Sequence, residues 1–251
     1  MRRIEWQAAT LEQITIETPG VKTFTLRPSR WHPFRSGQHY DIRLTAPDGY
    51  QAQRSYSIAS APENQGALDF TIELIPNGVV SPFFHEAVKI GDKIEIRGPI
   101  GGPFTWSVTD GAPLLLPLLL VGGGSGIVPL MSMLRHRRES PEKPDATLLY
   151  SSRTLPDVIY RRELDGMSAP GETLSVHHTI TRGAPPGWRG YSRRVDSEMI
   201  AEITERSGTA CVAYICGPDG FVETAADLLV ARGIPPPSIH TERFGPSGPQ
   251  A

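Results

Sequence analysis

The pattern of apolar and polar positions changes character near the middle of the chain. Up to about Phe104, short segments with alternating apolar and polar residues are separated by turns rich in Pro, Gly, Asn and Asp. Such segments predict β-strands. The expected strands are Val21–Leu26, Gln38–Leu44, Ser55–Ala59, Leu68–Ile75 and Lys93–Ile96. Several short antiparallel strands of this kind indicate a small β-barrel.

One helix is expected between the last two of these strands. Ser81 is a residue type favoured at a helix N-cap, and Pro82 suits the first helical position. Apolar side chains then recur at helical spacing, at Phe83, Phe84, Ala87 and Val88.

The second half begins after Ser107–Pro113, a segment with the composition of a linker. Its expected strands are Leu118–Val121, Thr147–Tyr150, Leu174–Ile180 and Ala210–Cys216. The helices expected between and after them are Ile127–Arg138, Asp157–Met167, Asp196–Arg206 and Phe221–Arg232. This alternation predicts a doubly wound parallel sheet. We therefore expect a β-barrel domain over residues 1–106 and an α/β domain over residues 113–251.

Composition and charge exclude only a few classes of protein. A chain of 251 residues is long enough for two domains of roughly 100–150 residues each. A net charge of −2 argues against a strongly basic nucleic-acid binder. The longest apolar run, Leu114–Val121, is interrupted by Pro117 and falls short of the ~20 residues that a membrane span needs. No apolar signal-peptide core follows Met1, so we expect a cytoplasmic protein without membrane insertion, with a monomer as the default.

The two cysteines, Cys211 and Cys216, bound an apolar run that predicts a strand. Such a run spans ~16 Å, whereas the Cα atoms of a disulfide lie within ~7 Å, so the two cannot bridge each other there. Two thiolates are also too few for a four-thiolate iron–sulfur cluster. The histidines show no metal-ligand spacing, because the adjacent His177 and His178 would point to opposite faces of a strand. We expect no metal site.

A glycine-rich loop, Gly122–Gly126, directly follows a predicted buried strand and opens a predicted helix. Glycines at such a junction let the backbone approach a pyrophosphate, and the helix N-terminus supplies unpaired N–H groups. The alternative is a tight turn without a ligand. The loop departs from the usual dinucleotide fingerprint G-x-G-x-x-G, because Pro129 stands where the third glycine belongs.

The end of the next strand differs from that of an ordinary NAD-binding fold. An acidic residue usually binds the ribose 2′-hydroxyl there, whereas this chain has Ser152 followed by Arg153. A hydroxyl and a guanidinium are suited to a 2′-phosphate. The alternative for Arg153 is a solvated surface arginine.

Three motifs together resemble the ferredoxin–NADP reductase superfamily. Arg54–Ser57 matches its R-x-Y-S motif, Gly124–Pro129 its G-x-G-x-x-P motif, and Cys216–Pro218 its C-G-P motif, in the family's order and in the corresponding halves. The resemblance covers essentially the whole chain. It implies a six-stranded antiparallel FAD-binding barrel, then an NAD(P)-binding domain, with no fused iron–sulfur domain.

The resemblance also implies roles for residues of the barrel. Arg54 would pair with the flavin pyrophosphate, Tyr56 would pack on the isoalloxazine, and Ser57 would offer its hydroxyl to flavin N5. Ser55 completes this motif. The segment Gly78, Val79, Val80 and Ser81 is similar to the family's second phosphate contact. Gly98–Gly101 resembles the turn that closes the barrel.

In the nucleotide half, the residues implied to contact the nicotinamide nucleotide are Gly124, Ser125, Gly126, Ile127, Pro129, Ser152, Arg153, Arg182, Cys216, Gly217 and Pro218. Arg182 is similar in placement to a second 2′-phosphate arginine, with a solvated loop arginine as the alternative. Cys216 would lie beside the nicotinamide C4, with a small buried strand-end residue as the alternative.

The stretch Thr241–Phe244 resembles the family's E-x-aromatic ending. Phe244 would cover the flavin, and Glu242 would assist hydride or proton transfer. The chain departs from the family by having Phe in place of Tyr and by continuing through Gly245–Ala251. The alternative is a last strand that packs one Phe into the core.

The resemblance implies an FAD-dependent NAD(P)H oxidoreductase in which Ser57, Cys216 and Glu242 are the catalytic candidates. Hydride would pass from NADPH, or from NADH, to FAD, and electrons would pass to an external ferredoxin, flavodoxin, partner oxygenase or metalloenzyme. One alternative is a diaphorase or flavin reductase that reduces small free acceptors. Another is a non-catalytic nucleotide-binding subunit.

Overall fold

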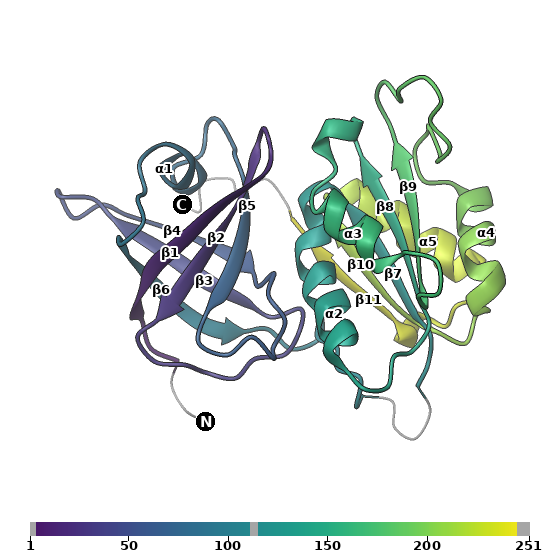
Figure 1. The fold of residues 1–251 in the computed structure, drawn as a ribbon, viewed down its shortest axis with the longest axis horizontal. Helices are drawn as coiled ribbons and strands as arrows, with labels where there is room; N and C mark the ends of the chain where they lie inside the picture. The colour runs from purple at the N-terminus through teal and green to yellow at the C-terminus, as the bar shows by residue number, and fades with distance from the viewer. Residues whose placement is uncertain (1–3, 111–114, 245–251) are drawn as a thin grey trace. The chain divides into compact units, whose positions relative to one another are not determined.

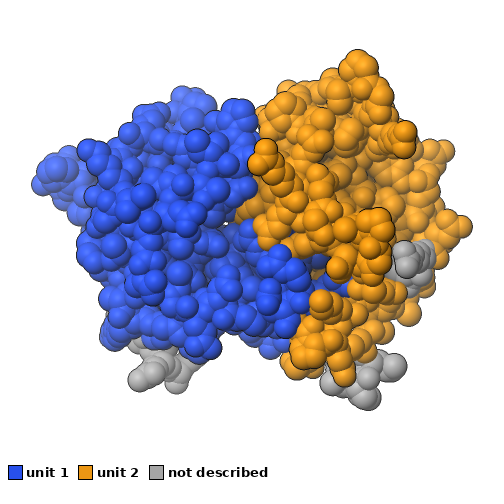
Figure 2. Space-filling view, in the orientation of Figure 1, with its two compact units in different colours: residues 1–107, 131–139 blue, residues 108–130, 140–251 orange. Residues whose placement is uncertain are grey.

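The computed structural model describes residues 4–110 and 115–244. By its contacts the chain forms two compact units (Figure 2), which are described separately below. The barrel unit comprises residues 1–107 and 131–139, and the α/β unit comprises residues 108–130 and 140–251. Residues 131–139, which the sequence pattern places in the second predicted domain, thus group with the barrel. The tail 245–251 lies outside the described residues.

The barrel unit contains the predicted six-stranded antiparallel sheet (Figure 1), in the order β4-β3-β6-β1-β2-β5. Its strands are β1 (Gln7–Thr18), β2 (Val21–Pro28), β3 (His39–Thr45), β4 (Gln51–Ser57), β5 (Leu68–Glu73) and β6 (Lys93–Ile100). An isolated bridge between Ile58 and Phe70 links the end of β4 to β5, the other edge of the sheet. Buried side chains of all six strands, together with Phe84, form one apolar core.

Within the barrel unit, β1 is the strand that the sequence pattern did not reveal. Its register against β2 shifts twice, between Leu11 and Gln13 and between Ile16 and Thr18. Each shift breaks the alternation of buried and exposed positions, and Ile16 is consequently 72% exposed. A period-two search therefore has too few regular repeats to detect this strand.

Two local predictions in the barrel were wrong. Helix α1 (Val80–Glu86) has Val79 at its N-cap, so Ser81 lies inside the first turn, where its Oγ accepts a hydrogen bond from the Ile75 N–H at 3.0 Å. Gly98–Ile100, expected in a turn, belongs to β6. A Cβ on Gly98 would lie 2.5 Å from the Tyr40 ring, so this glycine permits close packing within the sheet.

The α/β unit contains the predicted parallel sheet, in the order β11-β10-β7-β8-β9. Its strands are β7 (Leu118–Gly123), β8 (Ala146–Ser152), β9 (Leu174–Ile180), β10 (Val212–Gly217) and β11 (Ile239–Arg243). Its helices include α3 (Arg161–Met167), α4 (Ser197–Ser207) and α5 (Asp219–Ala231); α2 (Ile127–Glu139) begins here and ends in the barrel unit.

The helix expected over Asp157–Met167 is shorter than predicted. A 3₁₀ turn at Leu155–Asp157 precedes it. Tyr160 then adopts a left-handed conformation with φ of +57°. A non-glycine residue there interrupts a right-handed helix, so α3 begins only at Arg161.

The two faces of the parallel sheet have different partners. Leu119, Val121 and Ile215 belong to one apolar cluster with residues of α4 and α5, such as Met199 and Val222. Because side chains alternate along a strand, the even-numbered residues of β7, β8 and β10 point to the opposite face. The residues predicted to bind the nucleotide thus lie on that face or at the strand ends beside it.

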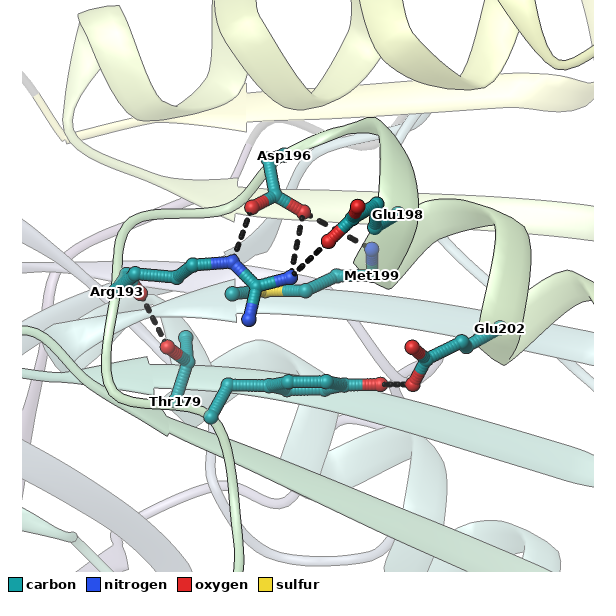
Figure 3. Close-up of polar contacts among 7 residues, drawn as sticks. Thr179, Arg193, Asp196, Glu198, Met199 and Glu202 are labelled. Carbon is teal, nitrogen blue, oxygen red and sulfur yellow. Dashed lines mark hydrogen bonds and ion pairs between the residues drawn. The ribbon is translucent and has the colours of Figure 1, made fainter.

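The outer edge of β9 is covered by the segment that follows it. The Tyr191 N–H donates to the His178 carbonyl at 3.0 Å, and the Ile180 N–H donates to the Tyr191 carbonyl at 2.9 Å. These bonds satisfy backbone groups that an edge strand would otherwise leave open. A polar cluster fixes this segment to β9 and α4 (Figure 3): Thr179, Tyr191, Arg193, Asp196, Glu198 and Glu202.

Candidate functional site

The glycine loop connects β7 to α2 through a 3₁₀ turn, Gly124–Gly126. A Cβ on Gly126 would lie 2.1 Å from the carbonyl oxygen of Cys216, closer than any real contact. The loop therefore rests directly on the end of β10, and this packing requires glycine. The predicted motifs at 124–129 and 216–218 are thus in contact within the α/β unit.

The loop has the features of a phosphate-binding turn. The first N–H groups of a helix have no intrahelical acceptor, and they lie at the positive end of the helix dipole. Gly124 has φ of +56°, and a Cβ placed on it would meet no atom within 4 Å, so the loop borders open space. Pro129 lies in the first turn of α2, where its missing N–H leaves no hydrogen bond unmade.

Ser152, Arg153 and Arg182 come together at the neighbouring ends of β8 and β9. Backbone bonds join the two ends, because Thr181 N–H donates to Ser152 O at 2.9 Å and Arg182 N–H donates to Arg153 O at 2.7 Å. Ser152 is only 5% exposed, and its Oγ has no hydrogen-bond partner among the described residues. Both arginines are exposed. Buried polar atoms are normally paired, so the Ser152 hydroxyl fits a role in binding a ligand.

Cys216 is fully buried at the end of β10 and pairs in register with Glu242 of β11. Burial, reinforced by the Glu242 carboxylate, raises the pKa of the Cys216 thiol well above its usual range. The thiol therefore stays protonated at neutral pH and is a poor nucleophile. Burial of Cys216 is compatible both with a place beside the nicotinamide and with the role of a small buried residue at the end of a strand.

Glu242 and Phe244 are half-buried at the end of the edge strand β11. The Phe244 N–H donates to the Gly217 carbonyl at 3.0 Å. This bond continues the β10–β11 ladder beyond Arg243 and places the aromatic residue beside the C-G-P motif. Phe244 is not part of the buried core of the sheet.

In the barrel unit, β4 divides its four predicted residues between two faces. Arg54 and Tyr56 are half-buried and alternate with Ser55 and Ser57. The Tyr56 ring packs edge-on against Phe84 of α1, with ring centroids 6.4 Å apart. Burial raises the pKa of Tyr56 to about 12, so its phenol is neutral and suited to packing on a flat aromatic ligand.

The guanidinium of Arg54 donates to the Gln53 carbonyl at 2.6 Å and forms no ion pair with the residues that the structure describes. An Arg without a carboxylate partner is suited to bidentate binding of a phosphate. Val79, next to Gly78 in the second predicted phosphate segment, is 50% exposed. Ser81 keeps its hydroxyl proton available, because its oxygen accepts from Ile75. The barrel residues therefore fit the phosphate and the ring system of a flavin nucleotide.

Asp41 is a supporting residue that sequence reasoning missed. It accepts hydrogen bonds from Ser55 at 2.7 Å and from Arg97 at 2.6 Å. Burial alone would raise its pKa, but these bonds outweigh burial, so the pKa of Asp41 is lowered and it stays charged. The only sequence signal is an acid between two apolar residues, Tyr40 and Ile42, in a predicted strand.

Two further findings limit what the described residues contain. Within the ranges 4–110 and 115–244, no helix is long and apolar enough to cross a membrane. Over the same ranges, no group of three or more His, Cys, Asp or Glu residues is arranged to hold a metal ion.

Comparison with known proteins identifies both halves. Residues 8–105 match the FAD-binding domain of oxidoreductases, and residues 120–227 match the oxidoreductase NAD-binding domain. The chain is 31% identical over 215 residues to ferredoxin–NADP reductase B of Sorangium cellulosum, covering 84% of this chain and 85% of that relative. It is 30% identical over 240 residues to the glycine betaine monooxygenase reductase subunit of Pseudomonas aeruginosa, covering 93% of this chain and 63% of that relative.

The fold is shared with a cytochrome P450 reductase from Amycolatopsis, at a TM-score of 0.83 and 22% identity, covering 99% of this chain and 72% of that structure. The two matches identify the first unit as an FAD-binding domain and the second as an NAD-binding domain, both of the oxidoreductase type. The chain belongs to the ferredoxin–NADP reductase superfamily. It spans about three fifths of the length of several curated relatives that it matches, including the monooxygenase reductase subunit.

Proposed function

We propose that this chain takes a hydride from NADPH and delivers electrons, through FAD, to an external acceptor. The observation that carries the proposal is the contact between Gly126 and the Cys216 carbonyl. It joins the glycine loop to the C-G-P motif, in a chain whose barrel has, beside Tyr56, an Arg54 guanidinium that forms no ion pair with the described residues.

FAD, when bound, supplies the redox chemistry, because it accepts a hydride and releases electrons singly or in pairs. The chain's own residues bind and orient. Arg54 and the segment 78–81 would hold phosphate groups, and Tyr56 would pack on the flavin ring. Ser57 would donate its hydroxyl at flavin N5. Phe244 would cover the face of the flavin ring.

On the nucleotide side, the loop 124–129 would hold the pyrophosphate, with Gly217 and Pro218 beside it. Cys216 would pack its neutral thiol against the nicotinamide, because its raised pKa keeps it protonated. Glu242, paired with Cys216 on the neighbouring strand, would hold or move a proton near the reacting atoms.

Three residues at the ends of β8 and β9 are the reason for proposing NADPH rather than NADH as the hydride donor. Ser152 has a buried hydroxyl without a partner in the described chain, and Arg153 and Arg182 lie beside it at the strand ends. A 2′-phosphate would satisfy all three groups, whereas the 2′-hydroxyl of NADH carries no charge for the arginines.

The proposed acceptor is a protein, namely a ferredoxin, a flavodoxin or a partner oxygenase. Support comes from the relatives, one of which is named as the reductase subunit of a monooxygenase and another as a ferredoxin–NADP reductase. A cytoplasmic location fits this proposal. The alternatives are a diaphorase that reduces free flavin, and a nucleotide-binding subunit without activity.

The experiment is an acceptor panel with the purified chain. NADPH oxidation is followed with ferredoxin, flavodoxin, free FMN and ferricyanide. The proposal predicts a yellow protein whose kcat/KM is highest for a protein acceptor. A higher kcat/KM for free FMN would favour the flavin reductase, and no NADPH oxidation with any acceptor in the presence of FAD would contradict enzyme activity.

A further inference from the structure

The carbonyl group of Gly124 is held by two donors inside the α/β unit. The N–H of Ile127 donates to it along the chain, and the hydroxyl of Tyr150 donates to it from β8 at 3.1 Å. The same phenolic oxygen accepts the Ile159 N–H at 3.3 Å. Tyr150 is fully buried, so its hydroxyl reaches the Gly124 carbonyl from the protein interior.

The direction of this carbonyl fixes the direction of the next amide. A peptide unit is planar and trans, so its C=O and N–H groups point in opposite directions. With the Gly124 oxygen turned inward to Tyr150, the N–H of Ser125 points away from Tyr150. This amide lies at the start of the 3₁₀ turn Gly124–Gly126 that leads into α2, where an N–H has no acceptor within the turn.

The loop needs such an anchor because its own residues do not fix its conformation. Glycine populates left-handed and right-handed backbone conformations about equally, and Gly122, Gly123, Gly124 and Gly126 make up most of the loop. A rotated peptide at Gly124–Ser125 would present a carbonyl oxygen to the ligand in place of an N–H. The partial negative charge of the carbonyl oxygen would then face the negative pyrophosphate, and this repulsion would oppose binding.

We propose that Tyr150 is a positioning residue of the nucleotide site: its hydroxyl holds the Gly124 carbonyl inward and so keeps the Ser125 amide available for the pyrophosphate. This inference deepens the proposed function, because it rests on the glycine loop as the pyrophosphate site. Tyr150 does not touch the nucleotide itself. It acts through one peptide group.

The position of the Tyr150 ring is fixed by its neighbours in the sheet. Tyr150 pairs in register with Gly122 on one side and His178 on the other. The His178 ring lies 5.9 Å from the tyrosine ring, and Trp188 packs edge-on against His178 at 6.4 Å. These ring contacts hold the tyrosine ring in place, so the Tyr150 hydroxyl stays within hydrogen-bond distance of the Gly124 carbonyl.

The test replaces Tyr150 by phenylalanine, which keeps the ring and removes the hydroxyl. Equilibrium binding of ADP-ribose, which contains the pyrophosphate, is compared with binding of 2′-AMP, which lacks it. We expect Y150F to weaken ADP-ribose, NAD⁺ and NADP⁺ by a common factor of about three to ten, the range for one lost hydrogen bond. Binding of 2′-AMP stays unchanged, since its phosphate interacts with other residues.

The matched control is Y191F, which removes a hydroxyl that contacts Glu202 in the same unit and is expected to leave all four dissociation constants unchanged. Equal ADP-ribose affinity in Y150F and the unaltered protein would overturn the inference, even if the variant melts at a lower temperature. An equal loss for 2′-AMP would also overturn it. Failure of the unaltered protein to bind any of the nucleotides would overturn the proposed function as well.

Discussion

The two units of this protein prepare their sites by different physical means. In the barrel, the candidate binding residues are mainly side chains of β4, and an ion pair between the buried Asp41 and the partly exposed Arg97 is linked to that strand through Ser55. In the α/β unit, the candidate phosphate site consists mostly of backbone, because the loop from Gly122 to Gly126 has amides with little side-chain volume around them.

This difference determines how each site fails. A side-chain site loses function when a charge or a hydrogen-bonding partner is removed, since the remaining partner then lacks its hydrogen bond. A backbone site loses function when volume is added, since the packing around a glycine cannot yield. Substitutions of the two kinds therefore separate the two halves of the proposed reaction.

The largest expected effect is on the stability of the barrel. Asp41→Ala leaves Ser55 and the partly exposed Arg97 without their acceptor, and we expect the free energy of unfolding to fall by about 2–3 kcal/mol, the range for lost hydrogen bonds to a charged group, with loss of bound FAD. Urea unfolding and the flavin content of the purified protein measure this. The exposed pair between Arg27 and Glu12 provides the control, because E12Q is expected to cost less than about 1 kcal/mol. Equal destabilisation by the two variants would contradict the assigned role of Asp41.

A second prediction concerns added volume in the α/β unit. Gly126→Ala places a methyl group against the Cys216 carbonyl, and we expect NADP⁺ binding to weaken roughly 10- to 100-fold, as overpacking of about 1–3 kcal/mol implies. FAD content stays normal. Gly166→Ala is the control, because a Cβ there meets no atom within 4 Å and α3 gains helix propensity. Unchanged NADP⁺ binding in G126A would contradict the loop assignment.

A third prediction concerns the choice of nucleotide. Arg153→Ala is expected to lower kcat/KM for NADPH about tenfold and to leave that for NADH unchanged, because one charge-assisted contact is worth roughly 1.5–3 kcal/mol before solvent screening. Arg189→Ala, an exposed arginine after β9, serves as control. A wild-type preference for NADH, or an equal loss for both nucleotides in R153A, would refute the NADPH proposal.

The smallest effect is the pH dependence of stability. Burial lowers the pKa values of His39, His177 and His178 in the folded protein. The unfolded chain therefore binds protons first, below about pH 6.5, and stability falls as the pH drops through that range. Thermal unfolding at pH 7.5 and pH 5.5 tests this, with the lower Tm expected at pH 5.5. An unchanged or higher Tm at pH 5.5 would contradict it.

The sequence was most informative where structure is locally periodic. The bounds of β9 were predicted to the residue, and the glycine loop was placed between β7 and α2, because buried parallel strands and helix starts have strong local signals. Strand β1 was missed because its bulges break the alternation. The N-cap of α1 was misplaced because the Ser81 hydroxyl serves Ile75 instead.

Two supporting residues of the sites were beyond sequence reasoning for a different reason. Asp41 is hydrogen-bonded to Arg97, 56 residues away in the chain, and Tyr150 is hydrogen-bonded to Gly124, 26 residues away. Such partners are set by strand order and register. No local pattern of a single sequence contains that information.

The most direct measurement is an anaerobic titration of flavin absorbance in the unaltered protein and in G126A. Dithionite is expected to bleach the flavin fully in both proteins, because the barrel is unchanged. With NADPH, the unaltered protein should need about one equivalent per flavin, since each supplies one hydride, whereas G126A should need a large excess. A protein that binds no FAD, or whose flavin is not bleached by NADPH, would contradict the account.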